Sequence, residues 1–313
     1  MSYTVAACRP EELDLLRAVV SDPTLQSEYS WLVQHGELGD PFEHPHVDRE
    51  GVFLAWCDGR PVGFCMLMLW PSTRGRWSMI RLGVLGDHRR RGVAGQLLRT
   101  VEERIRALAA DVRPIEVCLS AWQPNPEAGA FAAAHGYRPS RGFWSMERPR
   151  GPGAAVAWPD GVEVRAFDGS DRALKDWNDA YNLAFAENYL TIWSTVEDCR
   201  RITTLDHFHP DGLLLAYRDG ACVGFCRNAL FRDYGEIDVL GVVPEARGIG
   251  LGRALLRWGV DWLQRRDTPH VRLMVDAENE SALRLYRTEG FETLRTRQAW
   301  SRRVGADGRL LDP

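Results

Sequence analysis

Residues 235–252 read GEIDVLGVVPEARGIGLG and place a glycine-rich turn between two apolar patterns. The β-branched run at 237–242 predicts a strand. Apolar residues after the turn recur with helical spacing, which predicts an amphipathic helix; they are Leu251, Leu255, Trp258 and Trp262. Glycines at such a junction let successive backbone N–H groups point into one concavity at the helix N-terminus, where an anion is stabilised.

The same pattern occurs twice in the chain, in the same order and at a slowly drifting distance. Cys65 and Cys226 lie 161 positions apart in matching strand patterns, and Gly92 and Gly250 lie 158 apart in matching turns. Gly136 and Gly290 follow at a distance of 154. Self-similarity that keeps its order over this length indicates two copies of one domain.

A stretch rich in proline and glycine separates the copies, from Pro149 to Gly161. Neither a helix nor a strand continues through such a stretch. We therefore expect a first domain at 1–149, a linker at 150–160 and a second domain at 161–313.

Each copy mixes strands and helices. In the second copy, the turn at 218–220 predicts a hairpin of residues 213–217 and 222–229. The strand at 237–242, the helix after the glycines, a strand at 271–275 and a helix at 281–288 follow. The fold class expected is α/β in an α+β arrangement, repeated in tandem.

Composition excludes several classes of protein. With 45% hydrophobic and 26% charged residues, the 313-residue chain is typical of globular proteins, and no apolar run is long enough to span a membrane. A net charge of -4 argues against nucleic acid as the main ligand. The seven cysteines lack C-x-x-C spacing, and no metal site is expected. The start lacks a signal-peptide pattern, so we expect a cytoplasmic protein.

The turn between strand and helix supplies the candidate phosphate-binding residues of both copies. In the second copy they are Arg247, Gly248, Ile249, Gly250, Leu251 and Gly252, and in the first copy Arg89, Arg90, Arg91, Gly92, Val93, Ala94 and Gly95. One glycine-rich turn alone is a weak signal. Its duplication in register strengthens the prediction.

With Asn279, Ala282 and Tyr286 after the turn, and Gly290-Phe291 closing the pattern, the chain resembles the GNAT family of acyl-CoA-dependent N-acetyltransferases. The resemblance implies two mixed, mostly antiparallel sheets whose central strands splay apart and are flanked by helices. It also implies acetyl-CoA as the cofactor, with its pantetheine arm in the gap. The residues that it places beside the arm are Leu240, Gly241, Val242 and Asn279, and in the first copy Leu82, Val84 and Asn125.

The second copy is also similar to the mycothiol synthases, tandem members of that family that acetylate the cysteinyl amine of a pseudodisaccharide. The similar stretches include residues 159–162, 184–186 and 210–213. The acid and base of those enzymes fall on Tyr286 and Glu236. Residues 187–209, which would line the acceptor cleft, match poorly.

Chemistry supports Glu236 and Tyr286 independently. Aminolysis of a thioester needs a group that removes a proton from an ammonium and one that protonates the departing thiolate. Glu236 at the strand start suits the first task and Tyr286 on the last helix suits the second. Asp238 shares the face of Glu236 by the strand period of two and is a substitute base. The non-catalytic alternative for Glu236 is a solvated acid at a strand end, and that for Tyr286 is an aromatic ring packed in the core.

The first copy carries neither group. Ser78 stands at the position of Glu236, and Ala132 at that of Tyr286. We expect one catalytic site, in the second domain, and a non-catalytic first domain.

Aromatic and acidic residues in the helical start of the second domain suit a cationic acceptor, although core packing is the simpler explanation, because aromatic residues on helices mostly face the core. The aromatic residues are Tyr181, Phe185, Tyr189, Trp193 and Phe208.

The function expected is acetyl transfer from acetyl-CoA to the primary amine of a small molecule, by direct attack. The acceptor is an amino sugar, an antibiotic or a cysteinyl pseudodisaccharide, the last making the protein a mycothiol synthase proper. Modification of a protein N-terminus and a non-catalytic, CoA-binding sensor are alternatives. The oligomeric state is left open.

Overall fold

The computed structural model describes residues 2–29, 41–72, 75–109, 115–187, 193–305, 307 and 309–311. The chain forms two compact units, one of residues 1–141 with 297–313 and one of residues 142–296. The described elements that lie wholly in the first unit are β1 (Tyr3–Ala7), η1 (Pro10–Glu12), α1 (Leu13–Val20), β2 (Val47–Cys57), β3 (Arg60–Ser72), β4 (Gly75–Val84), η2 (Gly86–His88), α3 (Val93–Ala109), β5 (Ile115–Trp122), α4 (Pro126–Ala134) and β13 (Leu310–Leu311).

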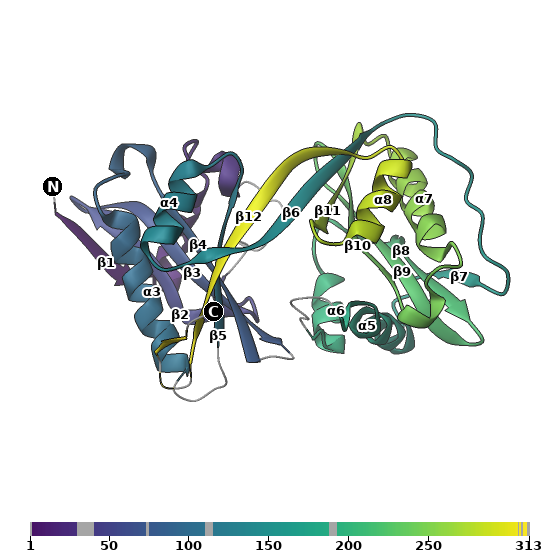
Figure 1. Cartoon of the computed structure of the whole chain (residues 1–313), viewed down its shortest axis with the longest axis horizontal. Helices are drawn as coiled ribbons and strands as arrows, with labels where there is room; N and C mark the ends of the chain where they lie inside the picture. The colour runs from purple at the N-terminus through teal and green to yellow at the C-terminus, as the bar shows by residue number, and fades with distance from the viewer. Residues whose placement is uncertain are drawn as a thin grey trace. The chain divides into compact units, whose positions relative to one another are not determined.

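Those that lie wholly in the second unit are β7 (Glu163–Ala166), α5 (Asp171–Phe185), α6 (Val196–Ile202), β8 (Phe208–Arg218), β9 (Ala221–Leu230), β10 (Gly235–Val242), η3 (Pro244–Ala246), α7 (Leu251–Gln264), β11 (His270–Asp276) and α8 (Glu280–Thr288). Two long strands, β6 (Arg138–Pro149) and β12 (Glu292–Val304), cross between the units (Figure 1). The hairpin, strands and helices predicted for the second half are confirmed.

The two units have matching sheets. Strands follow the order β1-β2-β3-β4-β5-β12 in the first unit and β7-β8-β9-β10-β11-β6 in the second. In each, only the pair before the last strand is parallel, β4 with β5 and β10 with β11, and the other pairs are antiparallel. The mixed, mostly antiparallel fold expected from the sequence is confirmed.

Each half of the chain gives its last strand to the sheet of the other unit. Residues 143–149 of β6 pair with β11, and residues 297–304 of β12 pair with β5. The units therefore divide the chain differently from the expected boundaries at 149 and 161, which rested on turn residues. Turn residues mark where an element ends but do not specify which strand it pairs with.

The stretch expected to be a linker, residues 150–160, lies against the second unit. Arg148 Nη2 donates a 2.8 Å hydrogen bond to the carbonyl of Pro152, and Arg257 Nη1 donates a 3.3 Å bond to that of Ala155. These bonds anchor the stretch beside α7.

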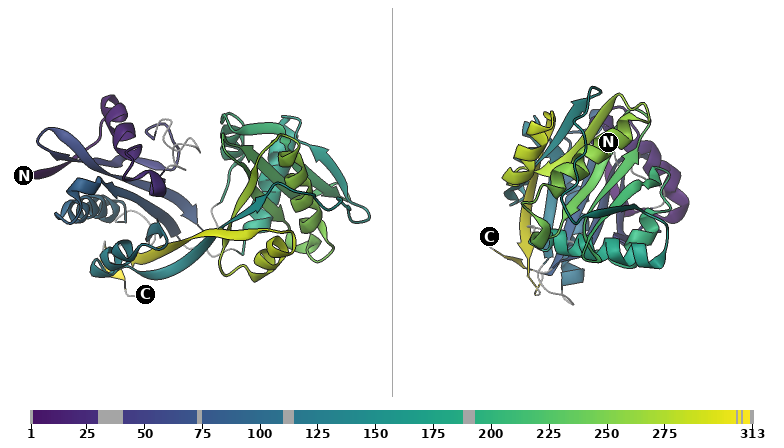
Figure 2. Two further views of the ribbon diagram at one scale, coloured as in Figure 1. Left: turned by 90° about the horizontal axis from the view of Figure 1, so that it is seen from above. Right: turned by 90° about the vertical axis from the view of Figure 1, so that its right-hand side faces the viewer.

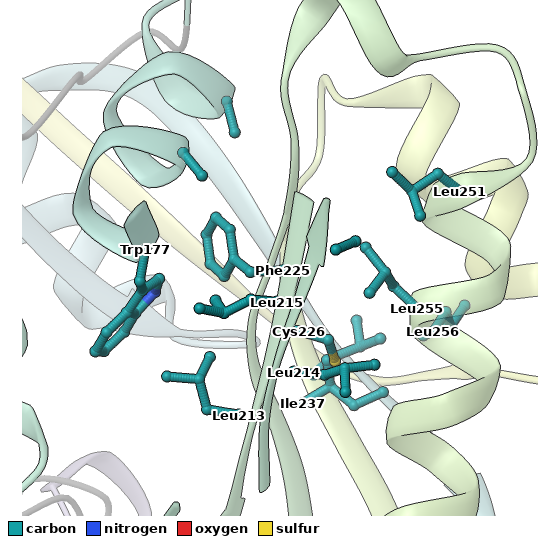
Figure 3. Close-up of a cluster of buried hydrophobic side chains, with 14 of the residues drawn as sticks. Trp177, Leu213, Leu214, Leu215, Phe225, Cys226, Ile237, Leu251, Leu255 and Leu256 are labelled. Atoms are coloured by element: carbon teal, nitrogen blue, oxygen red, sulfur yellow. The ribbon is translucent and has the colours of Figure 1, made fainter. Parts of the chain in front are cut away.

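Helices cover both faces of each sheet. In the second unit, Leu213, Leu215 and Phe225 point toward Trp177 of α5, while Leu214 and Cys226 point toward α7 (Figure 3). In the first unit, helices α1 (purple) and α3 (blue) lie on opposite faces of the sheet (Figure 2). The alternation follows the strand period of two, which gives each sheet two apolar faces.

Candidate active site

The sheet of the second unit opens at Glu236. Strands β10 and β11 pair in parallel only at Gly235 with Val271 and at Glu236 with Arg272. Beyond Glu236 the two strands have no paired residues, so the splay between the central strands is present. The first unit opens likewise, since β4 and β5 pair only from Arg76 to Met79 on β4.

Backbone groups of Leu240 and Val242 face this opening. On β9, Cys226 lies opposite Leu240 and Gly224 lies opposite Val242. The next pair of the ladder is hydrogen-bonded, because the N–H of Val243 donates a 3.0 Å bond to the carbonyl of Val223. Hydrogen-bonded and non-bonded pairs alternate in an antiparallel ladder. Leu240 and Val242 therefore each belong to a non-hydrogen-bonded pair with a β9 residue, and their backbone N–H and C=O groups point away from β9. The resemblance implies that these groups bond the pantetheine arm.

A bulge interrupts β10 at Asp238. Ile237 lies opposite Asn228 and Val239 opposite Arg227, which leaves Asp238 as the extra residue. Its carboxylate forms an ion pair with the largely buried guanidinium of Arg227. That guanidinium also lies 5.4 Å from the centroid of the Trp177 ring. Bulges of this kind redirect side chains at active sites.

The carboxylates of Glu236 and Asp238 both affect the pKa of Tyr234. Burial raises the pKa of Tyr234, and the charges of both carboxylates raise it further. Glu236 lies where the pairing of β10 with β11 ends, and its side chain is partly buried, so it is the candidate base at the opening.

Tyr286 combines a packed ring with an unpaired hydroxyl. The residue is 9% exposed, and its ring centroid lies 6.0 Å from that of Phe291. Within the described part of the chain, its hydroxyl has no hydrogen-bond partner, and it is not among the buried unpaired polar atoms. Burial, with a smaller contribution from Cys226, raises the pKa of Tyr286 to about 12. The hydroxyl is therefore protonated at neutral pH.

The glycine-rich turn has the conformation that a nest of amides requires. Gly248 and Gly250 have φ values of 81° and 91°, a region that favours glycine. Gly250 is also the N-cap of α7, and a Cβ atom there would meet no neighbour within 4 Å. A Cβ at Gly252 would lie 3.7 Å from Val242 and 3.9 Å from Leu285, so β10, the turn and α8 meet at this point.

The side chains of this turn differ in exposure. Ile249 is 39% exposed, whereas Leu251 is buried in the core and can offer a ligand only its backbone amide.

Arg247 has different partners from those implied by the resemblance. Its Nε donates a 3.3 Å bond to the carbonyl of Val242, and its Nη2 donates a 2.9 Å bond to that of Ala184. Arg89 of the first copy likewise bonds the carbonyls of Val84 at 3.0 Å and Thr24 at 2.7 Å. Both guanidinium groups tie a strand end to a preceding segment, and the expected contact of Arg247 with pyrophosphate stays a prediction.

The family model described as the acetyltransferase (GNAT) family matches residues 16–137 and again residues 174–291. The chain belongs to the GNAT family. A mycothiol acetyltransferase of Thermomonospora curvata is 37% identical over 249 residues, which cover 78% of this chain and 79% of the relative.

Solved structures show the same fold as this GNAT acetyltransferase. A GCN5-related N-acetyltransferase from Sphaerobacter thermophilus has a TM-score of 0.71 at 24% identity, covering 97% of this chain and 96% of that one. A tandem GNAT protein from the clavulanic acid biosynthesis pathway has a TM-score of 0.69 at 19% identity, covering 97% and 98%.

Two asparagines act as helix caps in this GNAT chain. Asn279 Oδ1 accepts a 3.1 Å bond from the N–H of Ala282 at the start of α8, and Asn125 Oδ1 accepts a 3.0 Å bond from that of Ala128 at the start of α4. The oxygen of each amide is thus committed to its cap. Only the amide nitrogen of Asn279 is available to a cofactor beside it.

The first GNAT copy retains the turn but neither of the two candidate catalytic side chains. Arg90 adopts a φ of 59° where the second copy has Gly248, and Gly92 a φ of 82°. Arg91 is exposed, Val93 is buried in the core, and Ala94 and Gly95 are partly buried. Met79 ends the pairing of β4 with β5 as Glu236 ends that of β10 with β11, because the extra residue Asp238 shifts the match by one position from Ser78. Ala132, at the position of Tyr286, is buried.

The expected aromatic cluster of the GNAT acceptor side divides between core and surface. Tyr181 and Phe185 have ring centroids 4.9 Å apart and pack on the buried Phe225. Phe208 is buried, Trp193 is 45% exposed, and Tyr189 lies outside the described residues. Burial raises the pKa of Tyr181, and Arg227 and Asp238 act on that pKa, so Tyr181 lies close to the bulge.

The described residues of the GNAT chain contain neither a metal-ligand cluster nor a membrane-spanning helix. No group of three His, Cys, Asp or Glu side chains among them is arranged to hold a metal ion. None of the described helices is long and apolar enough to cross a membrane.

Proposed function

We propose that the second half of this GNAT acetyltransferase transfers an acetyl group from acetyl-CoA to the primary amine of a cysteinyl pseudodisaccharide, the acceptor of mycothiol synthases. The observation that carries the proposal is the opening of the sheet at Glu236, together with a glycine nest and the unpaired hydroxyl of Tyr286. The first copy has an opening and a turn but neither of these two side chains. The name of the Thermomonospora curvata relative supports the choice of acceptor.

The residues at this opening fit acetyl-CoA, which supplies an acyl group activated as a thioester. Amides of the turn at Gly250 and of the first residues of α7 would hold its pyrophosphate. The N–H and C=O of Leu240, which have no partner among the described residues, would bond the amides of its arm. The amide nitrogen of Asn279 lies at the start of α8 to add a further bond.

Glu236 and Tyr286 accept and donate the protons of the reaction. Glu236 accepts the proton that the acceptor ammonium loses, directly or through water, and the freed nitrogen forms a bond to the acetyl carbon. The N–H of Val242 points into the opening and donates to the carbonyl oxygen, which gains negative charge. As the carbon–sulfur bond breaks, Tyr286 donates its proton to the thiolate. The nitrogen, now bonded to the acetyl carbon, loses its second proton to water, and water returns a proton to Tyr286.

The acceptor carries a cysteinyl thiol, which stays reduced in the cytoplasm. We therefore propose a cytoplasmic location.

The acceptor is tested by incubating the full chain with acetyl-CoA and each of three amines: the cysteinyl pseudodisaccharide, a simple amino sugar and an aminoglycoside antibiotic. Release of the CoA thiol and the mass of the product are measured. We expect turnover with the pseudodisaccharide at a kcat/KM at least about tenfold above the others, a difference of about 1.4 kcal/mol. Preference for another amine contradicts the acceptor, and no thiol release with any amine contradicts the enzymatic function.

A further inference from the structure

Two adjacent side chains, Glu28 and Tyr29, bridge the opening between β4 and β5 in the first unit. These strands pair only as far as Met79 and Cys118, and beyond this point their facing backbone groups need other partners. Tyr29 supplies them on β4, and Glu28 supplies one on β5.

Tyr29 satisfies both backbone groups of Leu82. Its hydroxyl donates a 2.5 Å hydrogen bond to the carbonyl of Leu82 and accepts a 3.2 Å bond from the N–H of the same residue. The tyrosine is 4% exposed, and its ring packs edge-on against Phe64 with centroids 5.2 Å apart. Burial raises the pKa of Tyr29, so the hydroxyl stays protonated and able to donate.

Glu28 is held on the opposite strand. Its Oε2 accepts a 3.0 Å bond from the N–H of Trp122 on β5, and its Oε1 accepts a 2.7 Å bond from Nη2 of Arg297. Arg297 is 5% exposed, and its Nε donates a 3.0 Å bond to Oγ of Ser120. This buried network fixes Glu28, and through the chain it fixes Tyr29.

Leu82 is the first-copy counterpart of Leu240. It lies opposite Cys65, and the N–H of Leu85 donates a 2.9 Å bond to the carbonyl of Val62, so the ladder makes Leu82 a non-bonded pair facing the opening. A hydroxyl both donates and accepts, as the two ends of an amide do. Tyr29 therefore makes with Leu82 the bonds that an amide of a CoA arm would make with Leu240.

We propose that Tyr29 permanently occupies the pantetheine position of the first copy, so that each chain holds a single CoA, in its second half. This inference rests on the proposed function, which places CoA at the second opening. A CoA arm entering the first unit would have to displace a buried ring and break both bonds to Leu82. The retained turn at Arg90 and Gly92 then stands beside a closed slot.

The experiment is hydrogen–deuterium exchange of the full chain with and without saturating CoA, with binding stoichiometry from native mass spectrometry. We expect one CoA per chain, protection of peptides covering residues 235–256 and no change in peptides covering 78–98. Two CoA per chain, or protection at 78–98, overturns the inference and leaves the proposed function intact. Protection in neither region contradicts the proposed function, and with it the single site.

A matched pair of variants locates the bound CoA independently. Ile249 is exposed on the turn, so its replacement leaves the core intact. Ile249→Glu places a negative charge beside the phosphates and is expected to weaken CoA binding at least about tenfold, whereas the uncharged Ile249→Gln, of the same size as the glutamate variant, is expected to weaken it by a smaller factor. One full equivalent of CoA bound with unchanged affinity in Ile249→Glu overturns the assignment to the second half.

Discussion

The guanidinium of Arg247 donates a 2.9 Å hydrogen bond to the carbonyl oxygen of Ala184, near the end of α5. The same group bonds the last residue of β10, and Arg89 repeats both contacts in the first unit. An arginine beside a glycine nest suggests a phosphate ligand from sequence alone. Here it joins the end of a central strand to the segment before the sheet, which holds the turn in place.

Arg247→Gln is therefore expected to lower the free energy of unfolding by about 1–2 kcal/mol, since two carbonyls lose a charged donor that is itself partly exposed. Arg89→Gln should have a similar effect. Denaturant unfolding and CoA titration of both variants check this. Unchanged stability with a loss of CoA affinity above tenfold would mean that Arg247 contacts the cofactor.

Removing a glycine from the turn of the second copy and introducing one into the turn of the first copy are expected to have opposite effects on stability. Gly248→Ala places a methyl group at a φ of 81° and is expected to cost about 1 kcal/mol. Arg90→Gly relieves a φ of 59° and is expected to stabilise the first unit by up to about 1 kcal/mol. Denaturant midpoints measure both changes, and equal signs for the two variants would contradict the matching of the turns.

Deletion of residues 297–313 tests the exchange of strands. It removes the partner of β5 together with Trp300 and Val304, both buried in the core of the first unit. Loss of the tryptophan alone costs about 3–5 kcal/mol. We expect hydrogen exchange to show loss of protection in β4 and β5, with β9 and β10 still protected. Loss of protection confined to the second unit would contradict the division of the chain.

Tyr286 predicts the alkaline side of the pH profile. Its pKa of about 12 lies above the ordinary value of 10.0, so the folded protein keeps the hydroxyl protonated through pH 10. We expect kcat to show no alkaline decline from this group between pH 7 and 10, and Tyr286→Phe to lower kcat about 100-fold across that range. A decline of kcat near pH 8 that disappears in Tyr286→Phe would contradict the raised pKa of Tyr286. Unchanged kcat in Tyr286→Phe would contradict its role as the acid.

The raised pKa of Tyr286 also affects stability. Its contribution is fully present below the unfolded pKa near 10 and is lost as the pH rises toward 12.

Much of the fold could be predicted because its signals are local. The hairpin at Asp219-Gly220 and the helix after Gly250 depend on residues adjacent in sequence. The strand exchange could not be predicted, because residues of β6 and β12 pair with residues 121 or more positions away, by sheet geometry that no turn residue encodes.

The candidate site was predicted unevenly for a similar reason. The place of Glu236 at the start of the central strand could be predicted from the strand pattern, but the bulge at Asp238 and its ion pair with Arg227 depend on the register of β9. Tyr29 was missed altogether. Its signal, a tyrosine 53 positions before Leu82, has meaning only once the orientation of the Leu82 amide is known.

The central claim is that the chemistry belongs to the second copy, and its most direct test compares Glu236→Gln with Ser78→Ala, a substitution of a buried polar side chain on the equivalent strand of the first copy. The measurement is kcat/KM for CoA release with acetyl-CoA and the cysteinyl pseudodisaccharide at neutral pH. We predict a fall of at least about 100-fold for Glu236→Gln and a change of less than about twofold for Ser78→Ala. Activity of Glu236→Gln within about threefold of the unsubstituted chain, or an equal loss in Ser78→Ala, would contradict the account.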